Sequence, residues 1–167
     1  MNHPSDAEVS QALDRIKQFC FENELGVAVA ESVSSGFLQS VFSSEAEAGL
    51  FFEGGMTTYN CQQKQRFLDI PFEICDPCNG VDEEISKRMA LKICDLFNCS
   101  IGLSLTGYAS PIPEQGIFEL YAYGAIALHG KVIYCDRIIS EKENPDEIRK
   151  DFANILITAC GKILDSR

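Results

Sequence analysis

The sequence predicts an α/β fold, namely a three-layer α/β/α sandwich around a mixed β-sheet. Stretches with apolar residues at helical spacing alternate with short runs of β-branched and small apolar residues, as in domains whose helices cover both faces of a sheet. Two late runs, residues 119–128 and 131–139, flank His129-Gly130 and predict a β-hairpin, so the sheet includes antiparallel strands. The 167 residues, 46% of them hydrophobic, suit one core, and we expect residues 1–167 to form a single domain.

The N-terminal part is predicted to alternate helix and strand. Ser5 or Asp6 can cap a helix that ends near Asn23, because apolar residues recur there at helical spacing. A buried strand, a tight turn and a second helix are expected next. The two following elements are a strand over residues 49–59 and a short helix that Asn60 can start.

Two predicted loops interrupt the helices and strands in the second part of the chain. Residues 71–80 contain two prolines, two cysteines and a glycine, which favours a surface loop. An acidic first turn, starting at Asp82, then opens a helix that runs to Phe97. Residues 101–106 are expected to form a strand, and residues 107–115 a second loop. After the hairpin, a last helix opens at Pro145, with Asn144 as candidate cap.

Composition excludes several classes of function. The net charge of -11 and the pI of about 4.6 argue against nucleic-acid binding, which needs clustered Lys and Arg. The N-terminal residues are polar, and no apolar run approaches the roughly 18 residues that would span a bilayer. We therefore expect a soluble, cytoplasmic protein with no membrane contact.

The eight cysteines indicate neither a metal site nor a disulfide framework. Four of them lie in apolar patterns and are expected to be core residues in a reducing compartment: Cys20, Cys94, Cys135 and Cys160. Cys75 and Cys78 form a single C-x-x-C without a second ligand pair, so a turn on Asp76-Pro77 is the first interpretation and metal binding or redox exchange the alternative. We expect no metal and no cofactor.

The stretch from Gly26 to Gly36 is the candidate functional element. Its second half gathers Ser32, Ser34, Ser35 and Gly36 at a predicted strand-to-helix turn, where backbone N–H groups and hydroxyls can receive a phosphate or a developing oxyanion. The alternative is that Ser34 or Ser35 only caps the following helix.

Five motifs follow one another in a recognisable order. They are Val-Ala-Glu-Ser-x-x-x-Gly ending at Gly36, Phe-Glu-Gly-Gly-Met-Thr-Thr-Tyr over residues 52–59, Lys64, Val-x-Glu-Glu over residues 81–84, and Thr-Gly-x-Ala-x-Pro over residues 106–111. In order and spacing, residues 7–163 resemble the C-terminal domain of the CinA family. Stand-alone members of that family are nicotinamide mononucleotide amidohydrolases, which release ammonia and leave nicotinic acid mononucleotide.

The resemblance implies roles for individual residues. Ser32 matches the family serine and would be the nucleophile, and Lys64 would be its base, provided that burial lowers the pKa of the amine. Tyr59 would line the pocket and orient the lysine or the ring. Substrate-binding positions would be Glu31, Ser34, Ser35, Gly36, Thr106, Gly107 and Arg149. The alternatives are a solvated Lys64, a core Tyr59, a Glu31 that pairs with Lys64 or satisfies backbone donors, and a Thr106-Gly107 that only ends a strand.

The chain departs from the family pattern around the expected nucleotide. Ser35 and Ser110 replace glycines, and Pro145 stands where the family has an arginine, although Arg149 keeps the next arginine position. Asp82 brings negative charge, and Cys61 is either a passive neighbour or a nucleophile in its own right. We expect an amidohydrolase acting on a small-molecule nucleotide; the alternative is an inactive CinA-like domain that binds a nucleotide or a protein. Exposed apolar strand or helix surface could support a homodimer.

Overall fold

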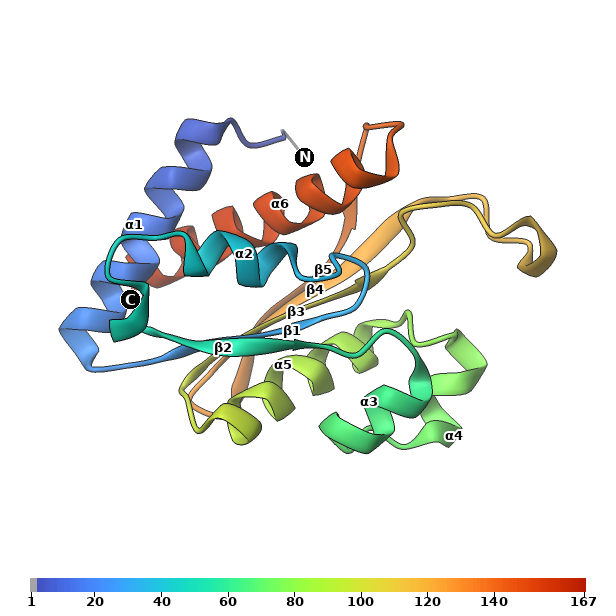
Figure 1. The fold of residues 1–167 in the computed structure, drawn as a ribbon, viewed down its shortest axis with the longest axis horizontal. Coiled ribbons are helices and arrows are strands. Elements are labelled where there is room, and N and C mark those ends of the chain that lie inside the picture. Colours follow the sequence, from blue (N-terminus) through green and yellow to red (C-terminus); the bar gives the residue numbers. More distant parts are fainter. Residues whose placement is uncertain (1–2) are drawn as a thin grey trace.

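A computed structural model describes residues 3–167 of the chain (Figure 1). Its helices are α1 (Asp6–Asn23), α2 (Phe37–Ser43), α3 (Cys61–Leu68), α4 (Phe72–Cys75), α5 (Glu83–Phe97) and α6 (Pro145–Asp165). Its strands are β1 (Val27–Glu31), β2 (Phe52–Thr57), β3 (Ile101–Gly107), β4 (Tyr121–Leu128) and β5 (Lys131–Ile139). Three short 3-10 helices complete them: η1 (Ala48–Leu50), η2 (Asp76–Cys78) and η3 (Pro113–Gln115).

The sheet is mixed, as the sequence predicts. Its strand order is β2-β1-β3-β4-β5. β1 lies parallel to both β2 and β3, whereas β4 is antiparallel to β3 and to β5. The turn between β4 and β5 places His129 at φ 48° and Gly130 at φ 72°, the left-handed backbone that a tight hairpin turn requires.

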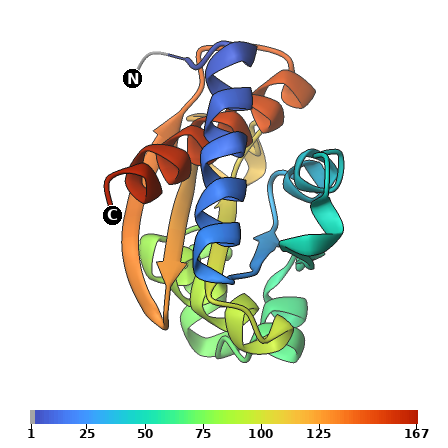
Figure 2. The same ribbon diagram turned by 90° about the vertical axis from the view of Figure 1, so that its left-hand side faces the viewer.

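Helices cover both faces of the sheet, which confirms the predicted three-layer α/β/α sandwich. α1, α2 and α6 lie on one face, with α1 packed against α6, and α3, α4 and α5 lie on the other (Figures 1 and 2). β1 divides its side chains between the two layers: Val27 and Val29 join the cluster of α1 and α6, whereas Ala28 and Ala30 join that of α3 and α5. All four are fully buried, as is usual for a strand with parallel neighbours on both sides.

The helix starts follow from their caps. Ser5 and Glu8 form a reciprocal capping box at α1, and the Asn144 side chain accepts from the backbone N–H of Asp146 at α6. Asp82 caps α5 by accepting from the N–H of Glu84 at 2.8 Å. Within residues 3–167, no helix combines the length and the apolar character needed to cross a membrane.

Three predicted boundaries were wrong. The strand expected over residues 49–59 is β2 alone, because η1 occupies residues 48–50 and the chain leaves the sheet after Thr57. The expected loop over residues 71–80 contains α4 and η2, whose turns bury the Cys75 side chain. The hairpin's first strand begins at Tyr121 rather than Glu119.

Candidate active site

The candidate site lies where β1, β2 and β3 end. Ser32 directly follows β1, Thr58 directly follows β2, and Gly107 is the last residue of β3. β1 lies between β2 and β3. The chain leaves β1 toward α2 on one face of the sheet and leaves β2 toward α3 on the other face (Figure 1). The carboxyl ends of strands at such a reversal are the usual ligand-binding position of open α/β sheets.

Lys64 and Ser32 form a direct hydrogen bond. The Lys64 Nζ lies 2.9 Å from the Ser32 Oγ and 2.8 Å from the backbone oxygen of Thr58. The Ser32 hydroxyl also lies 3.4 Å from the backbone oxygen of Tyr59. Lys64 is 1% exposed and Ser32 6% exposed, so the pair is shielded from water. Lys64 is therefore not on the solvated helix face that its polar neighbours favoured.

Burial lowers the pKa of Lys64 from its ordinary 10.5 to about 8, while the nearby Cys78 thiol raises it slightly. The physical cause is desolvation, because an ammonium loses more than an amine when water is removed. A substantial share of Lys64 is therefore neutral in mildly alkaline solution. A neutral amine at 2.9 Å can accept the proton of the Ser32 hydroxyl.

Glu31 orders the turn that follows Ser32. Its carboxylate is fully buried and accepts the backbone N–H groups of Gly36 at 2.9 Å, Leu38 at 3.1 Å and Gln39 at 2.9 Å. These donors belong to the first turn of α2, where a carboxylate is favourable. The structure therefore confirms the alternative in which Glu31 satisfies backbone donors, and not the one in which it pairs with Lys64.

The serine turn does not present all of its N–H groups to a ligand. Ser35 has φ 52° and Gly36 has φ 102°, so the serine occupies the left-handed backbone that the family glycine would accept more readily. The Ser35 N–H donates to the Ser32 carbonyl, and the Gly36 N–H donates to Glu31. The expectation that these two N–H groups would face an oxyanion or a phosphate is corrected, because both are already bonded within the turn.

The backbone N–H of Gly107 points toward the end of β1, where Ser32 lies. Tyr108 donates its N–H to Tyr121 at 2.8 Å, so by the alternation of an antiparallel ladder the Gly107 N–H points away from β4, toward the end of β1. A Cβ at position 107 would lie only 2.5 Å from the Ala122 Cα, which explains the glycine by close packing. Thr106 is fully buried and donates its hydroxyl to the Gly80 carbonyl, away from the pocket.

A pocket of about 270 Å³ opens beside Ser32. The predicted residues that line it are Ser32, Tyr59, Gly107 and Arg149. Tyr59 is 69% exposed, so the alternative of core packing was wrong, and the Lys64 amine is held by the Thr58 carbonyl instead of by this phenol. The Arg149 guanidinium contacts the Asp146 carboxylate at 2.7 Å.

Ser34 and Ser35 border a neighbouring cavity of about 500 Å³, which is lined further by Phe37 and the first turn of α6, including Arg149. Arg149 therefore lines both cavities. The buried Ser34 hydroxyl has no hydrogen-bond partner among residues 3–167. Ser110 lines the Ser32 pocket, whereas Asp82 does not, because its carboxylate caps α5.

The cysteine predictions need two corrections. Cys135, which was expected in the core with Cys20, Cys94 and Cys160, is only half-buried on β5, whereas the other three are buried. Cys61 forms a disulfide with Cys75, so Cys75 is not paired with Cys78, and Cys61 is no free thiol. This pairing joins the helix of Lys64 to α4, and only proximity in the fold could reveal it. Among residues 3–167, no group of three His, Cys, Asp or Glu side chains is arranged to hold a metal ion.

Several site residues were not predicted from the sequence. The Thr58 carbonyl fixes Lys64, and Asn60, Asn79, Val81, Tyr108 and Ile112 line the pocket. The sequence indicated a turn at Asn79, because this residue precedes Gly80 in a turn-rich segment. In the structure Asn79 adopts φ 51°, as such a turn requires. The backbone role of Thr58 has no signature in the residue type.

Fold and site together define an α/β sandwich in which a serine after the first strand meets a buried lysine beside a pocket. A CinA superfamily protein from Klebsiella pneumoniae has this fold, with a TM-score of 0.86 and 19% identity over 95% of this chain and 99% of that one. A CinA superfamily protein from Enterobacter cloacae gives a TM-score of 0.87 and 19% identity, covering 98% and 96%.

The family model of the CinA C-terminal domain matches residues 9–156, and the chain belongs to this family. A CinA-like protein from Cytophaga hutchinsonii is 36% identical over 135 residues, which are 80% of this chain and 30% of that protein. A putative competence-damage inducible protein from Listeria welshimeri is 31% identical over 62% of this chain and 25% of its own length. This chain thus matches less than a third of the length of these relatives.

Proposed function

We propose that this chain is an amidohydrolase that converts nicotinamide mononucleotide to nicotinic acid mononucleotide and ammonia. The observation that carries the proposal is the buried contact of 2.9 Å between the Lys64 Nζ and the Ser32 Oγ. A serine hydroxyl is a weak nucleophile until an adjacent base accepts its proton. The lowered pKa of Lys64, about 8, suits that task near neutral pH.

The reaction divides into two halves. Neutral Lys64 takes the proton of Ser32 while the Oγ attacks the carboxamide carbon, and the Gly107 N–H is oriented to stabilise the developing oxyanion. The Lys64 ammonium then returns the proton to the departing ammonia. In the second half, Lys64 activates a water molecule that hydrolyses the acyl-Ser32 ester and releases the acid.

The size of the pocket suits the flat pyridine ring of the substrate, with the phosphate at the rim. Its volume of about 270 Å³ is at the small end for ligand sites, so the pyridine ring would fill it and the rest of the nucleotide would extend outward. Tyr59 and Tyr108 offer aromatic surface along this path. Arg149 lines both this pocket and the next cavity, where it can exchange its contact with Asp146 for a phosphate.

Ammonia release from nicotinamide mononucleotide tests the proposal, with the acid product identified by chromatography. Wild-type protein should turn over, and Ser32→Ala should lose roughly 10⁶-fold in kcat, the scale on which serine nucleophiles matter. Ser43→Ala, at an exposed helix end, is the matched control and should keep full activity. Full activity in Ser32→Ala would exclude the nucleophile role.

The alternative is a domain that binds the nucleotide without chemistry. The observations that favour it are the Arg149–Asp146 contact of 2.7 Å and the strained serine at position 35. Melting temperatures measured with the amide and the acid mononucleotide separate the two cases, because a ligand that binds only the folded state raises the melting temperature. Stabilisation by both ligands without ammonia release would establish the binding domain.

A further inference from the structure

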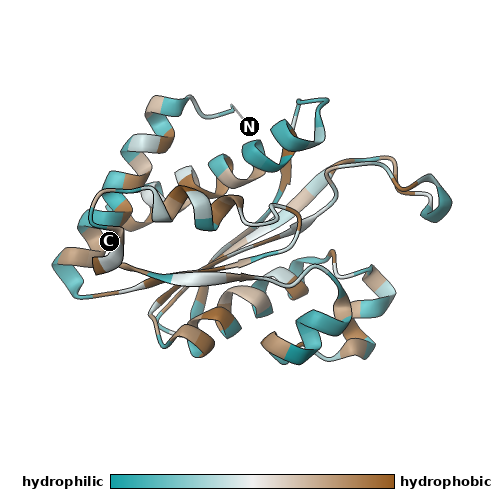
Figure 3. Cartoon of the chain, in the orientation of Figure 1, coloured by the Kyte–Doolittle hydropathy of each residue, from teal (hydrophilic) through white to brown (hydrophobic). Residues whose placement is uncertain are grey.

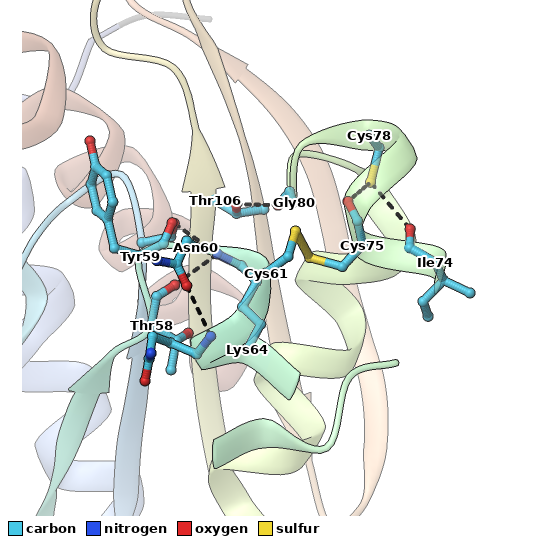
Figure 4. Close-up of a disulfide and its surroundings, with 12 residues drawn as sticks. Thr58, Tyr59, Asn60, Cys61, Lys64, Ile74, Cys75, Cys78, Gly80 and Thr106 are labelled. Atoms are coloured by element: carbon cyan, nitrogen blue, oxygen red, sulfur yellow. Dashed lines mark hydrogen bonds between the residues drawn. A yellow bond between two sulfur atoms is a disulfide. The ribbon is translucent and has the colours of Figure 1, made fainter. Parts of the chain in front are cut away.

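The Cys61–Cys75 disulfide is attached to the helix that carries Lys64. Cys61 is the first residue of α3, Lys64 follows one turn later, and Cys75 is the last residue of α4. The two cysteine Cα atoms lie 5.6 Å apart, within the usual range for disulfides. The bond therefore fixes the first turn of α3 against α4 (Figure 4).

Both sulfur atoms and the lysine stem border the same small space above Gly80. A Cβ at Gly80 would lie 3.4 Å from the Cys75 Sγ, 3.5 Å from the Cys61 Sγ and 3.5 Å from the Lys64 Cε. Gly80 itself is anchored to β3, because its carbonyl accepts the Thr106 hydroxyl. Cys61 and Lys64 also share the first turn of α3, so a change at the disulfide reaches Lys64 through this turn.

A third cysteine offers a chemical route to this bond. Cys78 donates its thiol to the Cys75 carbonyl at 3.2 Å, one 3-10 turn away. Cys78 is half-buried, whereas Cys61 is 8% exposed and Cys75 is fully buried. External thiol reagents reach exposed sulfur first, so Cys78 is the accessible partner for exchange.

We infer that the Cys61–Cys75 disulfide is a redox control on the Ser32–Lys64 pair, in which Cys61 and Cys75 position Lys64 and Cys78 resolves the bond. This inference rests on the proposed function and adds regulation to the same site. A disulfide that is exchanged in a reducing compartment is characteristically a transient, sensing one.

The exchange balances without a bound cofactor. The Cys78 thiolate attacks the Cys75 Sγ, a Cys75–Cys78 bond forms, and Cys61 leaves as a thiolate. One thiol of an external dithiol then attacks the Cys78 Sγ and releases Cys75, and the second thiol of the reagent breaks the resulting mixed disulfide. The reagent is oxidised to its disulfide, and the protein gains two electrons and two protons and holds three reduced cysteines. An oxidised dithiol reverses both steps.

The oxidised form is the one with an available base. Once released, the Cys61 sulfur is a titratable group on the same helix turn as Lys64, and a thiolate there favours the ammonium form. In the described chain the other groups at Lys64 are the Cys78 thiol of η2, the uncharged Ser32 hydroxyl and the Thr58 carbonyl. Reduction therefore keeps Lys64 protonated and frees the start of α3.

The test follows Lys64 directly as well as activity. The intact chain, oxidised or reduced with dithiothreitol, is labelled with an amine-acylating reagent across a pH series, and Lys64 labelling is measured by peptide mass spectrometry. Reduction should shift the Lys64 midpoint upward by at least one pH unit, and kcat/KM for ammonia release should fall at least tenfold and recover on re-oxidation. Cys78→Ser should slow reduction of the bond at least tenfold, and the control Cys135→Ser should not.

Two results would overturn the inference. One is a non-reducing digest of the oxidised chain that contains no peptide joined through Cys61 and Cys75. The other is a Lys64 midpoint that is identical in the oxidised and reduced chains. Because Lys64 labelling needs no turnover, a protein that hydrolyses nothing but shows the shifted midpoint refutes the proposed activity and retains the redox control.

Discussion

The two helical layers differ in the size of the apolar cluster that they cover and in the reactive groups that they bury. The layer of α1, α2 and α6 closes over the larger apolar cluster, including Phe42, Phe152 and Leu156. The opposite layer of α3, α4 and α5 has a smaller apolar cluster and also buries Lys64 and the Cys61–Cys75 disulfide. Figure 3 shows helices that alternate hydrophilic and hydrophobic residues on both sides, so the difference lies in the buried faces.

A buried aromatic ring and a buried amine affect the stability of the fold differently. A buried aromatic ring contributes about 3–5 kcal/mol relative to alanine, whereas a buried amine costs free energy unless its proton is shared or lost. Lys64 is tolerated because the Thr58 carbonyl and the Ser32 hydroxyl bond its Nζ. The first layer therefore covers the larger share of the apolar core, and the second layer carries Lys64 of the reactive pair.

The largest expected effect on stability comes from a substitution in the layer of α1, α2 and α6. Phe152→Ala should lower the free energy of unfolding by about 3–5 kcal/mol, because the ring is fully buried on α6 and its loss leaves a cavity. Urea denaturation at constant redox state measures it. Phe118→Ala, at a side chain 69% exposed, is the control and should change stability by less than about 0.5 kcal/mol. A loss below about 1 kcal/mol at Phe152 would contradict the assignment of stability to this layer.

The buried Lys64 should make the stability of the folded chain depend on pH. The pKa of Lys64 is about 8 in the folded chain and 10.5 ordinarily, so between these values the unfolded chain binds more protons. Stability due to this group must therefore rise with pH across that window, by roughly 3 kcal/mol in total, and stay constant below pH 8. Lys64→Met removes this dependence, and kcat should fall about 10²–10⁴-fold with the base.

Denaturation midpoints of wild type and Lys64→Met, compared at intervals from pH 7 to pH 10.5, measure the difference. Lys131→Met is the matched control, since Lys131 is exposed at the start of β5. Parallel stability curves for wild type and Lys64→Met would show that the amine is not desolvated in solution.

Much of the fold could be predicted from local sequence. The continuous apolar run at β1, the His129-Gly130 turn and the caps at Ser5 and Asn144 each depend on neighbouring residues only, and the structure confirms them. The short helices α4 and η2 could not be predicted, because Pro71 and Pro77 are equally compatible with a loop. The burial of Cys75 in α4 depends on its contact with α3, to which the disulfide joins it.

The site was predicted in part, for a related reason. Ser32 and Lys64 came from resemblance in motif order, and the structure brings them together across 32 positions of sequence. Glu31 and Thr106 were expected to bind substrate, yet their side chains bond backbone groups instead. Residue type alone cannot tell a carboxylate that faces a ligand from one that caps a helix. The Cys61–Cys75 bond likewise depends on tertiary proximity.

The smallest expected effect lies at Glu31, whose carboxylate bonds the start of α2 beside Ser32. Glu31→Gln replaces one acceptor oxygen by an amide that faces backbone donors, so we expect a loss of about 2 kcal/mol in unfolding free energy. Because the same bonds hold the turn after Ser32, kcat should fall while the pH midpoint of activity, set by Lys64, stays in place.

Denaturation and a pH–rate profile of the same preparation measure both consequences. Glu53→Gln, which neutralises an exposed carboxylate on β2, should leave both unchanged. A shifted midpoint in Glu31→Gln would mean that the carboxylate acts on the Lys64 proton itself. An unshifted midpoint with lower kcat would assign Glu31 to the geometry of the serine turn. The Glu31 carboxylate would then support both the stability of the layer that contains α2 and the position of Ser32 in the reactive pair.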